Sequence, residues 1–167
     1  PPLAISYWPY PVEVLGAASQ MTKPGIGHIM RCYGTHAVRR DSSASDLPVI
    51  RLALSLLRTG YSILIMPEGQ RNPDGLGEAQ LGAAYLASKA DIPIIPVAIT
   101  GTEKIFQSLR RGHRQKLHMQ IGPQYRLKTL KTTNQKQALQ TWTDTIMNRI
   151  ADLLPREYRG IYSDTLD

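Results

Sequence analysis

The stretch Pro67-Glu68-Gly69-Gln70-Arg71 places an acid and a base on either side of a glycine, directly after the apolar run Ser62 to Met66. A short apolar run of this kind is typical of a buried strand. In α/β folds, ligands bind just beyond the carboxyl ends of such strands. A carboxylate accepts hydrogen bonds from hydroxyl groups, and a guanidinium binds phosphate through paired N–H donors. The pattern therefore predicts a site for a substrate that carries a phosphate or a hydroxyl group.

Other residue types that often carry chemistry are sparse or isolated. His28, His113 and His118 have no carboxylate or histidine partner at metal-ligand spacing, so no metal site is expected. The single cysteine, Cys32, excludes an internal disulfide and a cysteine-rich zinc site. No complete set of catalytic groups is evident from the residues alone.

The elements that would position these residues alternate between strand and helix patterns. Gly60 follows one helical pattern and marks its end, and the residues after Pro155 are expected to form a surface tail. This alternation predicts one α/β domain over residues 1–167, with a mixed, mostly central β-sheet flanked by helices. The expected strands are 12–18, 37–40, 62–66, 94–100 and 117–121, and the expected helices are 25–33, 46–58, 78–90, 103–109 and 134–154.

Charge is spread unevenly along the chain. The net charge is +7, yet no Asp or Glu occurs between Lys104 and Thr143. Such a span is either a solvated basic face or a surface that attracts anionic lipid headgroups or an acidic carrier. Nucleic acid is not expected, because stacking platforms need more aromatic residues than this span contains. No apolar run approaches the length of a membrane-spanning helix, so any membrane association is expected to be peripheral.

Three segments occur in the order in which a known family has them. They are Gly34 to Arg40, Pro67 to Asn72, and Ile92 to Val97 leading to Thr100-Gly101-Thr102-Glu103. Together they resemble the second, third and fourth blocks of the glycerolipid acyltransferase family, of the lysophosphatidate (1-acylglycerol-3-phosphate) type. The resemblance covers roughly residues 1 to 105.

The resemblance implies a reaction, partners and a location. An acyl group would move from acyl-CoA or acyl carrier protein to the hydroxyl of a lysophospholipid or glycerol phosphate acceptor, in phospholipid biosynthesis. The thioester is a co-substrate, and no cofactor is implied. The implied location is peripheral, at the cytoplasmic side of an anionic membrane surface.

The resemblance also implies roles for individual residues. Arg40 matches the second-block arginine that would hold the acceptor phosphate, and Arg39 lies in an adjacent slot that faces the opposite side of a strand. Glu68 would accept a hydrogen bond from a glycerol hydroxyl, Gly69 would allow close backbone approach, and Arg71 would add a second cation. The alternative for Arg40 is a surface ion pair, and the alternative for Glu68 and Arg71 is an internal pair between their two side chains at the exit from a strand.

Several positions depart from the family pattern. Gln70 and Asn72 stand where the family usually has Thr and Ser, and Ala79-Gln80 replaces a Phe-Lys pair. The His and Asp of the first block, with four residues between them, would fall immediately before Pro1, so no catalytic residue is assigned within the chain. His36 and Asp41 have the same spacing but lie in the second block, and this match is attributed to chance. Low turnover by this chain is therefore expected, and a non-catalytic module that binds anionic lipid or an acidic partner is the alternative.

Overall fold

The computed structural model describes residues 12–17, 36–38, 47–70, 72, 75–102, 112–128 and 134–163, with backbone only at 15–17 and 36–38. The chain divides into two compact units, Pro1–Ile65 and Met66–Asp167. The expected helix at 25–33 and helical turn at 103–109 lie outside the described residues. Whether the chain is one domain therefore stays a prediction.

A small parallel sheet forms the first unit. Its strands are β1 (Val12–Ala17), β2 (His36–Val38) and β3 (Ser62–Leu64), with β1 in the centre and the order β2-β1-β3. The strand β1 pairs through Leu15 with His36 on one side and through Val12 with Ser62 on the other. Parallel neighbours require a crossover connection, and helix α4 (Leu47–Arg58) lies between β2 and β3 in the chain and contacts β3.

Glycine ends α4 as the sequence predicts. Gly60 has a φ of 87°, a left-handed conformation that glycine adopts without steric cost. Its N–H donates to Leu57 O at 3.2 Å, and Tyr61 N donates to Leu56 O at 3.1 Å, so the last carbonyls of the helix are satisfied. The helix buries Ala53 completely.

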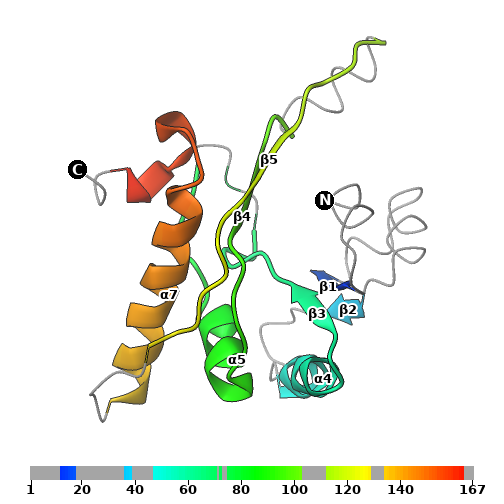
Figure 1. Ribbon diagram of the computed structural model, residues 1–167, viewed down its shortest axis with the longest axis vertical. Helices are drawn as coiled ribbons and strands as arrows, with labels where there is room; N and C mark the ends of the chain where they lie inside the picture. Colours follow the sequence, from blue (N-terminus) through cyan, green and yellow to red (C-terminus); the bar gives the residue numbers. More distant parts are fainter. Residues whose placement is uncertain are drawn as a thin grey trace. The chain divides into compact units, whose positions relative to one another are not determined.

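The second unit combines two helices with an antiparallel hairpin. Helix α5 (Gly82–Ala90) packs on helix α7 (Gln135–Ala151), and α7 also contacts β4 (Val97–Thr100), which pairs with β5 (His118–Ile121) (Figure 1). The core between these elements includes Ala84, Leu86, Ala87, Ala98, Met147 and Ala151. These observations confirm the mixed α/β class.

Two expected boundaries in this unit are wrong. The helix expected at 78–90 begins only at Gly82, because the backbone of Gln80 donates to Pro67 O at 2.8 Å and holds residues 78–80 in a loop. The strand expected at 94–100 is broken: Ile94 pairs with Tyr125, and regular pairing begins at Val97. Pro96, which has no N–H to donate, is buried at this bend.

The C-terminal residues also differ from expectation. Asn134 caps α7, since its side chain accepts from Lys136 N at 3.1 Å and Gln137 N at 3.3 Å. Beyond the helix, the expected surface tail instead forms two short 3-10 helices, η1 (Arg156–Tyr158) and η2 (Gly160–Tyr162). In the part of the chain that the structure describes, no helix combines the length and apolar character that crossing a bilayer requires.

Candidate functional site

Glu68 lies in a tight turn of four residues. The N–H of Gly69 donates to Met66 O at 3.0 Å, which closes the turn. Gly69 has a φ of 70°, a value that glycine tolerates and most side chains do not. Pro67 suits the second position of this turn, because its ring fixes φ near the value that the position requires. The Pro-Glu-Gly sequence therefore fixes the backbone that carries the Glu68 carboxylate.

The carboxylate of Glu68 is itself held in place. Its Oε2 atom accepts a hydrogen bond from the backbone N–H of Gly77 at 3.0 Å and another from the side-chain amide of Asn72. The side chain is partly buried, and no hydrogen bond from the described residues reaches Oε1. Because a carboxylate can accept about four hydrogen bonds, Glu68 keeps acceptor capacity for a further donor.

Asn72 and Gly77 both bond to the Glu68 carboxylate, and the sequence did not assign either residue to a site. Asn72 appeared only as a departure from the family pattern, yet its amide reaches Glu68. A Cβ atom at Gly77 would collide with the Asn72 amide nitrogen and would lie 3.5 Å from Glu68 Oε2. The signal for both residues was weak, because neither residue type is specific and their partner lies several positions away in the sequence.

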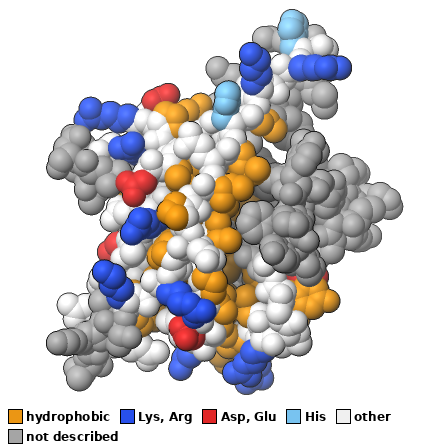
Figure 2. Space-filling model, viewed as in Figure 1, with side chains coloured by type: hydrophobic (Ala, Val, Ile, Leu, Met, Phe, Trp, Pro, Cys, Tyr) orange, Lys and Arg blue, Asp and Glu red, His pale blue; other side chains and the backbone are white. Residues whose placement is uncertain are grey.

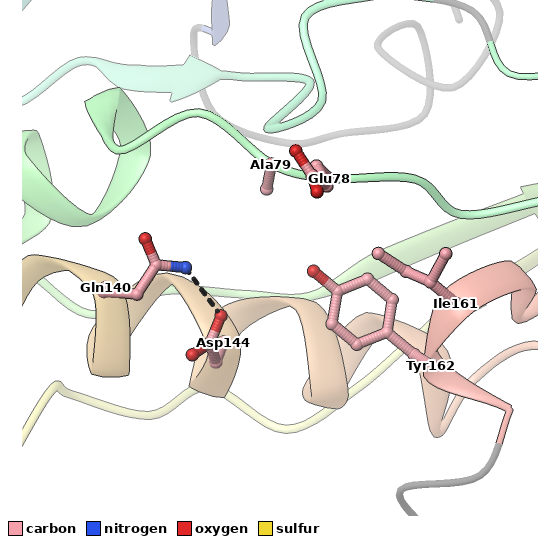
Figure 3. Close-up of a pocket in the computed structure, with 6 residues that line it drawn as sticks. All are labelled: Glu78, Ala79, Gln140, Asp144, Ile161 and Tyr162. Atoms are coloured by element: carbon pink, nitrogen blue, oxygen red, sulfur yellow. Dashed lines mark hydrogen bonds between the residues drawn. The ribbon is translucent and has the colours of Figure 1, made fainter.

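A pocket of about 410 Å³ lies beside this loop, between three segments of the second unit. Glu78 and Ala79 come from the loop, Gln140 and Asp144 from α7, and Ile161 and Tyr162 from η2 (Figure 3). Gln140 Nε2 donates to Asp144 Oδ1 at 3.1 Å. The pocket therefore presents carboxylates, an amide and a phenol to one space.

The phenol of Tyr162 stays protonated in this setting. Burial raises its pKa first, and the nearby carboxylates of Asp144, Glu68 and Glu78 raise it further. The hydroxyl points toward the space between α7 and the loop (Figure 3). Tyr162 is thus a neutral hydrogen-bond donor close to the Glu68 loop. The sequence does not point to Tyr162, because the residues after Pro155 are expected to form a surface tail.

Not all predicted site residues can be located. Glu68 and Gly69 occupy the turn described above, whereas Arg39, Arg40 and Arg71 lie outside the described residues, so their phosphate-binding role stays a prediction. Among the residues that the structure describes, no three His, Cys, Asp or Glu side chains lie close enough together to hold a metal ion.

The described part of the basic span includes an exposed strand. All four residues of β5 are exposed, including Met119 at 42% and Ile121 at 47%. Lys, Arg and His side chains gather at the top of the view in Figure 2, where the segment before β5 extends; its exposed basic residues include His113, Arg114 and Lys116. This surface combines positive charge with apolar side chains.

Comparison with known proteins finds acyltransferases at both the family and the single-protein level. A model of the acyltransferase family matches residues 2–100. The chloroplastic 1-acyl-sn-glycerol-3-phosphate acyltransferase BAT2 of Brassica napus is 32% identical over 90 residues, which cover 53% of this chain and 26% of that protein. The human 1-acyl-sn-glycerol-3-phosphate acyltransferase beta is 31% identical over 88 residues, covering 52% of this chain and 32% of that protein. The matches thus span about a quarter to a third of each relative.

A solved structure shares the fold. The 1-acyl-sn-glycerophosphate acyltransferase PlsC from Thermotoga maritima has a TM-score of 0.54 and 18% sequence identity, with 85% of this chain and 55% of that chain covered. The family match covers residues 2–100 of 167, which is more than half of the sequence. The chain therefore belongs to the acyltransferase family.

Proposed function

We propose that the protein takes part in moving an acyl group from a thioester to the hydroxyl of a 1-acylglycerol 3-phosphate, and that its Glu68 loop, residues 66–80, binds this acceptor. The family membership and the names of the relatives support the reaction class. The observation that carries the proposal is the Glu68 carboxylate, which is held through Oε2 and keeps Oε1 unbonded by the described residues.

Such a carboxylate suits a glycerol hydroxyl. A hydroxyl group is a weak nucleophile at neutral pH, and it must be oriented toward the thioester carbonyl before it can attack. Glu68 would accept a hydrogen bond from an acceptor hydroxyl and fix its direction. Because Gly77 and Asn72 already orient the carboxylate, little ordering is needed when the acceptor arrives.

Further roles come from the family resemblance alone. Arg40, with Arg39 and Arg71, would bind the acceptor phosphate through paired N–H donors. The donor would be acyl-CoA or acyl carrier protein, with no further cofactor. By the family resemblance, the histidine that removes the hydroxyl proton and its aspartate belong to the first block, and none of the residues named here takes that role.

Binding measurements test this proposal. A short-chain 1-acylglycerol 3-phosphate is titrated calorimetrically into the chain, its Glu68→Gln variant and its Arg40→Ala variant. Each substitution is expected to weaken binding about tenfold, because each removes a hydrogen bond that involves a charged group. Asp152→Asn, at an exposed acid after α7, is the control and should bind normally. Unchanged affinity in Glu68→Gln would refute the role of the loop.

A second function is favoured by the basic span, which has no acid from Lys104 to Thr143 and includes the exposed strand β5. The chain would then be a non-catalytic module that binds an anionic lipid surface or an acidic partner at the cytoplasmic face of a membrane. Sedimentation with anionic vesicles separates the two. Binding that is lost in a variant with Arg114, Lys116 and Lys128 changed to Gln, but kept in Arg40→Ala, favours the module.

A further inference from the structure

The C-terminal clip, residues 156–163, is bonded to the Glu68 loop at Leu76. The N–H of Leu76 donates to Tyr158 O at 3.1 Å, and the N–H of Ile161 donates to Leu76 O at 3.0 Å. Both backbone groups of Leu76 are therefore used by the clip. This arrangement ties a loop near the middle of the sequence to residues near its end.

Two glycines make this close approach possible. Gly160 has a φ of 52°, and a Cβ atom there would collide with Leu76 O and lie 2.6 Å from Leu76 N. Gly75 has a φ of 105°, and a Cβ atom there would lie 2.8 Å from Gly160 N. Distances this short exclude a side chain at either position unless the backbones separate.

The clip is one peptide bond away from the group that holds Glu68. Leu76 directly precedes Gly77, whose N–H donates to Glu68 Oε2 at 3.0 Å. On the other side of Gly77, Gln80 N donates to Pro67 O at 2.8 Å. The orientation of the Gly77 N–H is therefore set by two anchors, and the clip supplies one of them.

We propose that the C-terminal clip is a positioning element for Glu68, and that Gly160 is the residue on which the positioning depends. Its effect on acceptor binding rests on the function proposed above, whereas its effect on the loop does not. The clip lies beyond residue 100, where the family match ends. The site in this chain thus depends on residues outside the part that defines the family.

Tyr162, the last residue of η2, reports on the contact between the clip and the loop. Tyr162 lies near Glu68, and burial together with Asp144, Glu68 and Glu78 raises the pKa of its phenol. If the clip separates from the loop, the phenol becomes more hydrated and moves away from the loop carboxylates of Glu68 and Glu78. Its pKa is then expected to fall toward the ordinary value of a tyrosine.

The test compares Gly160→Ala with Gly60→Ala. Both glycines have positive φ, but a Cβ atom at Gly60 meets nothing within 4 Å, so only Gly160→Ala combines backbone strain with a collision. In Gly160→Ala, amide hydrogen exchange at Gly77 is expected to accelerate at least about fivefold, the equivalent of one lost hydrogen bond. The pKa of Tyr162, followed by NMR, is expected to fall. Both quantities should be unchanged in Gly60→Ala, and equal changes in the two variants would overturn the proposal.

A measurement on the unmodified chain covers the case in which Gly160→Ala does not fold. In native-state hydrogen exchange, the amides of Leu76, Gly77 and Ile161 are expected to open together, with one denaturant dependence. Exchange of Gly77 while Ile161 stays protected would contradict the proposal.

Acceptor binding then separates this inference from the function it rests on. Gly160→Ala is expected to weaken binding of a short-chain 1-acylglycerol 3-phosphate several-fold, and to add nothing in a Glu68→Gln background. Additive losses would show that Gly160 does not act through Glu68. If Gly77 exchange accelerates but Glu68→Gln binds normally, the clip is supported and the acceptor role of Glu68 is refuted.

Discussion

The Glu68 loop and the β4–β5 hairpin differ in how regular their backbones are and in how their residues are held in place. The hairpin is regular, with Val97 paired to Ile121 and Thr100 to His118, but its second strand is exposed along its whole length. The loop contains no helix or strand over its described residues, yet Gly77, Gln80 and the C-terminal clip all bond to it or within it. A segment without helix or strand can thus still be held in place by hydrogen bonds. The Glu68 loop is such a segment, and it is the better candidate for a site, because binding residues often lie on loops that a rigid scaffold positions.

The difference between the two regions can be tested by adding one methyl group to each of them. In the hairpin, Gly122→Ala would bring a Cβ atom within 2.9 Å of Pro96 Cγ and 3.3 Å of Leu153 Cδ1. We expect the free energy of unfolding to fall by about 2 kcal/mol, because a filled space is overpacked. Urea denaturation measures this change.

Gly82→Ala is the control for that variant. A Cβ atom at Gly82 meets nothing within 4 Å, and alanine favours the helix, so its stability should be equal or higher. Acceptor affinity should be normal in both variants. Weaker binding in Gly122→Ala would mean that the hairpin, too, determines the site.

In the loop, Gly77→Ala should show the reverse pattern. The added methyl group collides with the Asn72 amide and separates the Gly77 N–H from Glu68. Acceptor affinity is expected to fall about tenfold, equivalent to about 1.4 kcal/mol, while stability falls by about 1 kcal/mol or less. If calorimetry finds full affinity, the hydrogen bond from Gly77 does not orient the carboxylate.

Tyr125 lies just beyond the hairpin, where its backbone pairs with Ile94, and it allows a further test of stability in this region. Its hydroxyl is buried and has no hydrogen-bond partner among the described residues, while Arg149 lies 5.5 Å from the centre of its ring. Tyr125→Phe keeps the ring contact and removes the unpaired hydroxyl, so we expect a gain of about 1 kcal/mol in stability at neutral pH.

The stability gained in Tyr125→Phe is also expected to depend on pH. Burial raises the pKa of Tyr125 to about 12, and the positive charge of Arg149 partly opposes this rise. The folded protein therefore holds the phenol proton more tightly than the unfolded chain, whose tyrosine pKa is about 10. This stabilisation is complete below about pH 10 and is lost as the pH rises toward 12. Tyr125→Phe lacks that dependence, so its advantage should widen over this range; a constant difference would contradict the burial of the hydroxyl.

The smallest effect is expected at the surface of the second unit. Arg126 pairs with Asp91 at 3.2 Å, but their side chains are 57% and 92% exposed. Arg126→Ala should therefore cost about 0.5 kcal/mol, and added salt should shrink the difference. A loss several times larger in thermal denaturation would show that the bond from Arg126 to the backbone of Asp91 is an important anchor.

Sequence patterns predicted the elements whose signals are local. The end of α4 at Gly60, the strand β5 and the start of α7 at Asn134 follow from helical or alternating apolar spacing and from capping residues, all within a few positions.

Features that depend on distant partners were missed. The helix expected from residue 78 begins only at Gly82, because the backbone before it is held by hydrogen bonds from Gln80 to Pro67 and from Gly77 to Glu68. The clip was read as a tail because its bonds are made with Leu76, far away in the sequence. No periodicity encodes such a pairing, and the one local signal, Gly160, is common in surface turns.

The most direct test of the account is to follow the backbone amides by NMR during a titration with a short-chain 1-acylglycerol 3-phosphate. The account predicts saturable shifts at Gly69 and Gly77, with the same midpoint as the calorimetric titration and strongly weakened in Glu68→Gln. Saturable binding that leaves residues 66–80 unshifted and perturbs only residues 112–128 would contradict it.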